Sequence, residues 1–183
     1  KHSAWKITQV LTTPDKESAF EKLSVPCLLI DPEKIGSPET IKNIKKAKPD
    51  VFLFYGWSWM IPEMLYKNYP SLILHPSPLP KYRGGSPIQN QIIAGEQTSA
   101  VTILQATADV DAGDIYTQSI ISFEGSLNQI FNRIIKTGSK DTVLLLDGLA
   151  AKTLKPTPQD LSKGSYHKRR KLGDSEITLD DIR

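Results

Sequence analysis

Short apolar runs rich in β-branched and aromatic residues recur along the chain, and amphipathic segments lie between them. Five of these runs have the length and composition of β-strands: residues 6–11, 27–30, 51–55, 71–75 and 101–105. Helical patterns fill the intervals: residues 18–23, 38–47, 62–67 and 86–94. One helix is predicted to begin after Ser37 as its N-cap, with Pro38 in the first helical position. Because strands alternate with helices, the pattern predicts a doubly wound α/β fold with a mostly parallel, Rossmann-like sheet.

A longer amphipathic segment follows the last predicted strand. From Ser126 to about residue 152, apolar residues recur near every third or fourth position, which predicts a helix. Gly138 lies in its middle and is a candidate point for a break. We therefore assign residues 1–155 to one domain and residues 156–183 to a C-terminal linker or tail.

Composition limits the class of protein. With 183 residues, of which 39% are hydrophobic and 23% charged, the chain can bury one sizeable core. The net charge of +3 arises mainly in the C-terminal quarter, so it gives little support to nucleic acid as the main partner. Because no apolar run approaches the roughly 20 residues that span a bilayer, we expect no membrane partner and a cytoplasmic location. The single Cys27, within VPCLLI, is expected to be a small buried hydrophobe.

Two loops at predicted strand ends carry candidate catalytic residues. His75 leaves an apolar run and enters LHPSPLPKYRGGSPI, while ATADVDAGDI places Asp111 after the next strand. Ligands of open α/β sheets bind beyond the carboxyl ends of the strands, and a histidine with an aspartate can act as an acid/base pair. Taken singly, His75 could be a structural histidine and Asp111 a turn residue. The three histidines are far apart in sequence and no Cys or carboxylate cluster accompanies them, so we expect no metal site.

Together, the HPSPLP and DAGDI segments resemble those of the formyltransferases that use 10-formyltetrahydrofolate. The resemblance implies the formyltransferase fold, with His75 and Asp111 as the catalytic pair that serves transfer of a formyl group to an amine. Asp111 would then hold the tautomer of the imidazole and stabilise the imidazolium. Residues 6–11 resemble the second strand of that fold, so the family's first strand has no counterpart. We expect the sequence to be part of a longer chain.

One position departs from the family pattern. The family has an asparagine two residues before the histidine, whose amide helps to bind the developing oxyanion, whereas this chain has Ile73. Loss of one such donor typically lowers the rate by about 10² to 10³. Three alternatives stay open: His75 binds the oxyanion alone, another donor replaces the amide, or the chain is a catalytically impaired relative that binds folate or a nucleotide.

The resemblance also implies a binding region for the formyl donor. YGWSWMIP matches the family region beside the folate pteridine, although the tryptophans could equally be ordinary core residues. The loop before Asp111 would form the opposite wall through its backbone. The expected folate contacts are Trp59, Met60, Ile61, Ala108 and Asp109.

The prediction of the acceptor site depends on two segments, YRGGSPI and the basic tail SYHKRRKLGDSEI. Both strings resemble the methionyl-tRNA and sugar-nucleotide branches of the family more than the glycinamide ribonucleotide branch. Arginines suit a diphosphate, although such a run is often only solvated. The expected substrate contacts are Ser77, Tyr82, Arg83, Gly84, Arg169 and Arg170.

Two acceptors fit this resemblance. The C-terminal β-domain that the tRNA enzymes use has no counterpart in the sequence, which favours a nucleotide-linked amino sugar as the acceptor. Methionyl-tRNA is the alternative. The sequence leaves a homodimer open.

Overall fold

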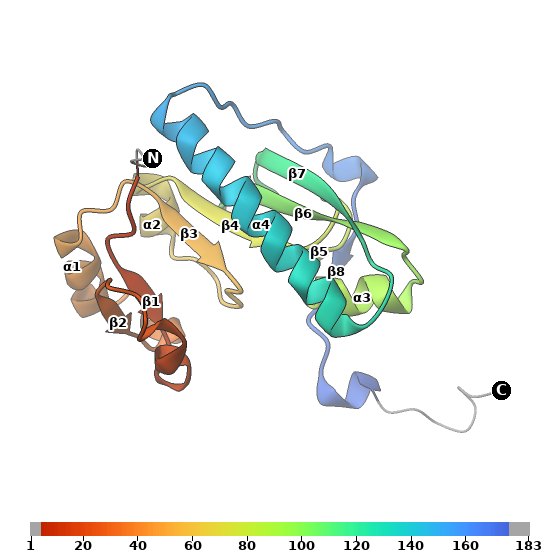
Figure 1. Cartoon of the computed structure of the whole chain (residues 1–183), viewed down its shortest axis with the longest axis horizontal. Coiled ribbons are helices and arrows are strands. Elements are labelled where there is room, and N and C mark those ends of the chain that lie inside the picture. The colour runs from red at the N-terminus through yellow and green to blue at the C-terminus, as the bar shows by residue number, and fades with distance from the viewer. Residues whose placement is uncertain (1–4, 176–183) are drawn as a thin grey trace.

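A computed structural model describes residues 5–175 (Figure 1). Its largest sheet has four strands in the order β3-β4-β6-β7. These strands are β3 (Phe52–Tyr55), β4 (Ser71–His75), β6 (Thr98–Gln105) and β7 (Ile115–Ser122). Strands β3 and β4 are parallel, whereas β6 is antiparallel to both β4 and β7. The sheet is therefore mixed.

Two smaller parallel pairs complete the strands. β1 (Val10–Thr12) pairs with β2 (Cys27–Leu29), and β5 (Arg83–Gly84) pairs with β8 (Tyr166–His167). The predicted α/β fold is confirmed, and the prediction of parallel pairing holds for these pairs and for β3–β4. It is wrong for β6 and β7, because a parallel pair needs a crossover of about a dozen residues or more and only a loop joins these two strands.

The helices lie close to their predicted positions. They are α1 (Pro38–Lys46), α2 (Glu63–Asn68), α3 (Pro87–Ile93) and α4 (Leu127–Ala150). The predicted cap of α1 is confirmed, since the Ser37 side chain accepts a hydrogen bond from the Thr40 N–H. Residues 18–23 do not form the expected helix; the segment folds instead as the 3₁₀ helix η1 (Pro14–Phe20). Three further 3₁₀ helices are η2 (Pro32–Lys34), η3 (Leu161–Lys163) and η4 (Leu172–Ser175).

Helix α4 is continuous and lies across one face of the four-stranded sheet (Figure 1). Ser126 and Gln129 form a capping box at its start. A break at Gly138 is therefore not found. A Cβ at Gly138 would lie 2.6 Å from Leu74 Cδ1, so the glycine allows α4 to approach the strand that ends at His75.

The core has a part on each side of β4. One cluster joins α1 and α2 to β3 through Ile30, Ile35, Ile41, Ile44, Phe54 and Leu65. A second cluster joins α3, β6, β7 and α4 through Ile88, Val101, Ile121, Phe123, Ile130 and Ile134. None of the helices between residues 5 and 175 has the length and apolar character needed to cross a bilayer.

Cys27 is exposed, so the prediction that it is buried is wrong. Side chains alternate between the two faces of a strand, and in β2 it is Leu28 that packs against the first core cluster. Cys27 and Leu29 lie on the opposite face, where both are exposed to solvent.

Candidate active site

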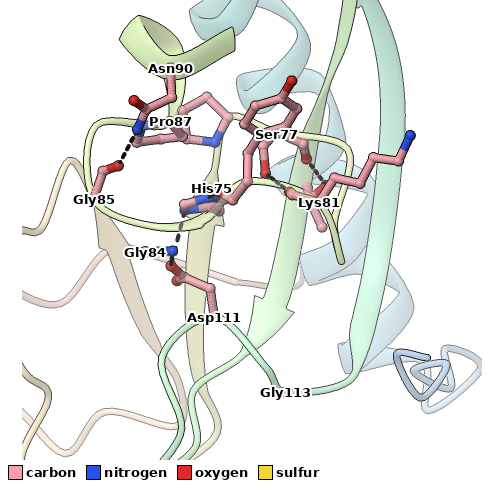
Figure 2. Close-up of polar contacts among 12 residues, drawn as sticks. His75, Ser77, Lys81, Gly84, Gly85, Pro87, Asn90, Asp111 and Gly113 are labelled. Carbon is pink, nitrogen blue, oxygen red and sulfur yellow. Dashed lines mark hydrogen bonds and ion pairs between the residues drawn. The ribbon is translucent and has the colours of Figure 1, made fainter. Parts of the chain in front are cut away.

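His75 and Asp111 come together at the carboxyl end of β4. His75 is the last residue of that strand, and Asp111 belongs to the loop between β6 and β7. The distance from His75 Nδ1 to Asp111 Oδ2 is 3.4 Å, and the two side chains are only 7% and 10% exposed. Figure 2 shows them side by side with Gly84. The predicted proximity of the two residues is confirmed.

The other ring nitrogen of His75, Nε2, contacts a backbone carbonyl. Nε2 lies 2.8 Å from the backbone carbonyl oxygen of Tyr82. A carbonyl only accepts hydrogen bonds, so the contact with Tyr82 places a hydrogen on Nε2. Each ring nitrogen of His75 therefore faces an oxygen atom, Nε2 that of Tyr82 and Nδ1 that of Asp111, and the role expected of the carboxylate stays a prediction.

Asp111 is held through both its side chain and its backbone. Its Oδ2 accepts a hydrogen bond of 2.9 Å from the Gly84 N–H. Its φ of 51° lies in the left-handed region, and its carbonyl accepts a hydrogen bond from Gln159 Nε2 at 3.0 Å. The same amide donates to the Gly113 carbonyl at 2.6 Å. No sequence pattern pointed to Gln159, because it lies in the segment that is predicted to be a linker.

Ser77 is engaged within the protein, and its expected role as a substrate contact stays a prediction. The residue is fully buried, and its hydroxyl donates to the Lys81 carbonyl at 2.9 Å. Its own carbonyl accepts a hydrogen bond from Thr102 Oγ1 at 2.7 Å. Ser77 therefore shapes the loop after His75 and ties it to β6.

Tyr82 is also engaged within the protein. Its φ is 59°, its N–H donates to Ser165 Oγ at 2.8 Å, and its hydroxyl donates to Glu96 at 2.7 Å. The hydrogen bond to Glu96 raises the pKa of the Tyr82 phenol above its ordinary value. The ring of His167 stacks on the Tyr82 ring, with 5.2 Å between centroids. Tyr82 thus contacts His75 through its carbonyl, and its expected role as a substrate contact stays a prediction.

Strand β5, in the loop that follows His75, pairs with β8 in the basic segment, which we define as residues 165–175. Gly84 has a φ of 89°, and a Cβ there would lie 2.3 Å from the His167 carbonyl oxygen, so only glycine allows β8 this close. Its neighbour Arg83 has a buried Nε that finds no hydrogen-bond acceptor among residues 5–175. A groove of about 530 Å³ lies beside Tyr82, with Lys81 and Lys163 among its lining residues.

The basic segment is docked rather than free. The Arg170 N–H donates to Ser86 Oγ at 3.1 Å, and its guanidinium donates to the Asp174 carbonyl. A Cβ on Gly85 would lie 2.3 Å from Arg169 Cα. This part of the predicted linker or tail is therefore docked on the rest of the protein. It packs on the loop that follows His75, while the side chain of Arg169 stays exposed.

The segment expected to contact folate presents aromatic and apolar surface. The rings of Trp57 and Trp59 have centroids 5.3 Å apart, and Trp59 and Met60 are 41% and 64% exposed. The Trp57 indole Nε1 is buried without a hydrogen-bond partner in the part of the chain that the structure describes. Ile61 packs against the first core cluster.

Ala108 and Asp109 are exposed in the loop before Asp111. The Asp109 carbonyl accepts a hydrogen bond from Thr107 Oγ1 at 3.0 Å. Their backbone groups lie on the same loop as the Asp111 carboxylate.

Ile73 lies on the same face of β4 as His75, because residues two apart in a strand point to the same side. It packs against the first core cluster and is half-buried. Its side chain offers no hydrogen-bond donor. Over the described range 5–175, no three His, Cys, Asp or Glu side chains converge in a way that could hold a metal ion.

The fold and this pair define an α/β protein with a buried histidine and aspartate at the end of a central strand. A family model described as formyl transferase matches residues 3–145, and the chain belongs to that family. It is 34% identical over 166 residues to methionyl-tRNA formyltransferase of Lysinibacillus sphaericus, a match that covers 86% of this chain and 51% of that protein. The corresponding protein of Sulfurihydrogenibium is 29% identical over 174 residues, with 92% and 55% covered. The chain thus spans about half the length of these curated relatives.

Solved structures agree with this fold. Methionyl-tRNA formyltransferase from Clostridium thermocellum has a TM-score of 0.73 at 25% identity and covers 95% of this chain and 78% of that one. The formyltransferase PseJ from Anoxybacillus kamchatkensis, solved with a UDP-linked formamido sugar and tetrahydrofolate, has a TM-score of 0.68 at 21% identity. This match covers 92% of this chain and 87% of that one.

Proposed function

We propose that this chain is the catalytic part of an N-formyltransferase that moves a formyl group from 10-formyltetrahydrofolate to a primary amine. The observation that carries the proposal is the buried contact of 3.4 Å between His75 Nδ1 and Asp111 Oδ2, in a member of the formyl transferase family. Transfer removes a proton from the acceptor amine and delivers one to the leaving folate nitrogen. A histidine is suited to such proton exchange near neutral pH.

The two residues have different tasks in this proposal. His75 exchanges its proton at Nδ1, because Nε2 is occupied by the Tyr82 carbonyl. Asp111 stabilises the imidazolium that forms, as the carboxylate does in other acid/base pairs. The low exposure of both side chains reduces screening by water and strengthens their interaction.

The donor site is proposed to include Trp59, Met60 and Ile61, with the backbone of Ala108 and Asp109 opposite. The described residues fit a flat heteroaromatic ring, since exposed apolar side chains lie beside an unused, buried donor at Trp57 Nε1. Binding sites of this kind combine apolar walls with a few polar groups. The bound folate would supply the activated formyl group.

For the acceptor, we propose an amine on a molecule that carries phosphate. The buried Nε of Arg83 without an acceptor supports an anionic ligand near Gly84, and the exposed side chain of Arg169 adds positive charge next to the same loop. Methionyl-tRNA is the first acceptor to test, because relatives of up to 34% identity carry that name. A nucleotide-linked amino sugar is the second, supported by the docking of the basic segment on the YRGG loop.

The test compares wild type and His75→Asn with 10-formyltetrahydrofolate and each acceptor, following release of tetrahydrofolate. We expect formylation of at least one acceptor by wild type, and a loss of at least about 10³-fold in His75→Asn, with folate binding changed little. Retained turnover in His75→Asn would refute the proposal. Charge reversal at Arg169 and Arg170 should raise the acceptor KM and leave the folate KM nearly unchanged; equal kinetics would remove these residues from the acceptor site.

Acceptor choice is read from the same assay. Salt-sensitive binding and formylation of methionyl-tRNA would establish methionyl-tRNA as the acceptor. Turnover with the sugar nucleotide but not with methionyl-tRNA would exclude methionyl-tRNA. A cytoplasmic location and a homodimer stay predictions.

A further inference from the structure

We propose that residues 159–167 form a clasp that positions the catalytic pair. This inference rests on the proposed function for its kinetic part only. The clasp contacts both loops that hold the pair: the loop that bears Asp111 and the loop that follows His75. Gln159, Ser165 and His167 make these contacts, and we assign them as positioning residues.

The first contact sets the backbone of Asp111. One amide group of Gln159 donates to two carbonyls of the loop, those of Asp111 at 3.0 Å and Gly113 at 2.6 Å. Asp111 adopts a φ of 51°, which is uncommon for a residue other than glycine. A residue in this region persists when its surroundings over-determine it. Gln159 supplies such a restraint at the residue that faces His75.

The second contact sets the carbonyl that holds His75. Tyr82, with a φ of 59°, donates its N–H to Ser165 Oγ at 2.8 Å, and its ring stacks on that of His167. The Arg83 N–H donates to the Ser165 carbonyl at 3.0 Å. Ser165 therefore holds the N–H groups on both sides of the Tyr82 carbonyl. The direction of the Tyr82 carbonyl follows from these restraints, and that carbonyl determines which nitrogen of His75 carries hydrogen.

Both nitrogens of His75 thus face groups whose backbone conformation depends on the clasp. Nδ1 faces Asp111, which Gln159 holds, and Nε2 faces Tyr82, which Ser165 and His167 hold. Two unusual backbone conformations in separate loops are restrained by one segment of chain. Loss of either restraint is expected to misalign the pair without touching any substrate.

The kinetic test uses Gln159→Leu and Ser165→Ala, with Gln97→Leu and Ser122→Ala as matched controls outside the clasp. Gln97 donates to the nearby Gly95 carbonyl, and Ser122 Oγ accepts a hydrogen bond from the Glu124 N–H at 3.1 Å. A misplacement of about 1 Å can lower a rate by about 10², so we expect kcat to fall about ten- to a hundred-fold in the clasp variants. The folate KM of the clasp variants should change by less than about two-fold, and so should the kcat of both control variants, because surface substitutions ordinarily have effects of this size.

Milder variants keep the test informative if one of these fails to fold. Gln159→Glu keeps the size of the side chain but removes the two amide donors, and it should lower kcat as Gln159→Leu does. Ser165→Thr keeps an oxygen acceptor for the Tyr82 N–H, and it should restore activity to within about three-fold of wild type. Activity of Gln159→Glu equal to wild type in folded protein would overturn the clasp.

Coupling to His75 separates positioning from general stability. In the His75→Asn background, Gln159→Leu should lower the residual rate no further, because the group it positions is gone. Additive losses in the double variant would overturn the proposal.

A spectroscopic measurement tests the clasp without activity. Nitrogen-15 NMR of the His75 ring in wild type should show the form with hydrogen on Nε2, and Ser165→Ala should change the ring signals. Identical His75 spectra in wild type and in both clasp variants would overturn the clasp. If wild type formylates no acceptor, the proposed function fails, while this measurement still decides the clasp.

Discussion

Replacing Asp111 by asparagine removes a charge with little change of shape. Asparagine keeps an oxygen that can accept the hydrogen bond from Gly84 N–H, which is 2.9 Å long in the structure. We therefore expect the free energy of unfolding to change by less than about 1 kcal/mol. Asp111→Ala, in contrast, leaves that N–H without its acceptor and should cost about 1 to 3 kcal/mol.

The expected effect on turnover follows from the geometry of the pair. At the 3.4 Å between His75 Nδ1 and Asp111 Oδ2, two unit charges attract by about 5 kcal/mol at an effective dielectric constant of about 20. This attraction exists only when the ring is an imidazolium, so its loss acts on the transition state. Each 1.36 kcal/mol corresponds to about ten-fold in rate, and the full value sets an upper limit near 10⁴. We expect kcat of Asp111→Asn to fall by about 10² to 10⁴.

The assay follows tetrahydrofolate release under saturating donor, with circular dichroism and urea unfolding to measure the folded fraction. Asp114→Asn is the matched control, because it removes a carboxylate from the same loop whose side chain is exposed. Its kcat should stay within about two-fold of wild type. A loss of less than about ten-fold in well-folded Asp111→Asn would refute the role given to the carboxylate.

Three further substitutions test the surroundings of the pair. Ile73→Asn should raise turnover per folded molecule by up to about 10² if an oxyanion donor is lacking, and unchanged turnover in folded protein would mean that another donor is present. Gly84→Ala, which forces a side chain to a φ of 89° and against the His167 carbonyl, should lower the free energy of unfolding by about 2 to 5 kcal/mol in urea and reduce kcat. Gly138→Ala gains about 1 kcal/mol of helix propensity but sets a methyl 2.6 Å from Leu74 Cδ1, at a cost of about 1 to 3 kcal/mol, so we expect a small net loss; a gain in stability would contradict this packing.

Local sequence patterns predicted the elements that depend on neighbouring residues. The bounds of β4 match the prediction at both ends, and Ser37 with Pro38 marked the start of α1, because apolar runs and caps act over a few residues. Strand β7 was missed. Its apolar residues are interrupted by polar ones, and only one of its eight residues is fully buried.

Some features of the candidate site could also be predicted from the sequence, and others could not. His75 and Asp111 could be paired from the sequence, since each lies in a loop after an apolar strand and the two loops resemble those of one family. The burial of Ser77 could not be predicted, because burial depends on what packs over a loop. Nor could the continuity of α4 at Gly138, where close packing on Leu74 outweighs the weak helix propensity of glycine.

The sequence by itself determined the α/β class, five of the strands, the longer helices, the family and the two residues of the pair, all of which are carried by short contiguous patterns. Tertiary structure alone decided which nitrogen of His75 carries hydrogen and what holds Asp111 in place. Those answers come from the Tyr82 carbonyl and from Gln159 and Ser165, which lie in a segment remote in sequence from the loops they contact. Backbone carbonyls are present at every residue, so only the folded chain shows which of them meets a catalytic side chain.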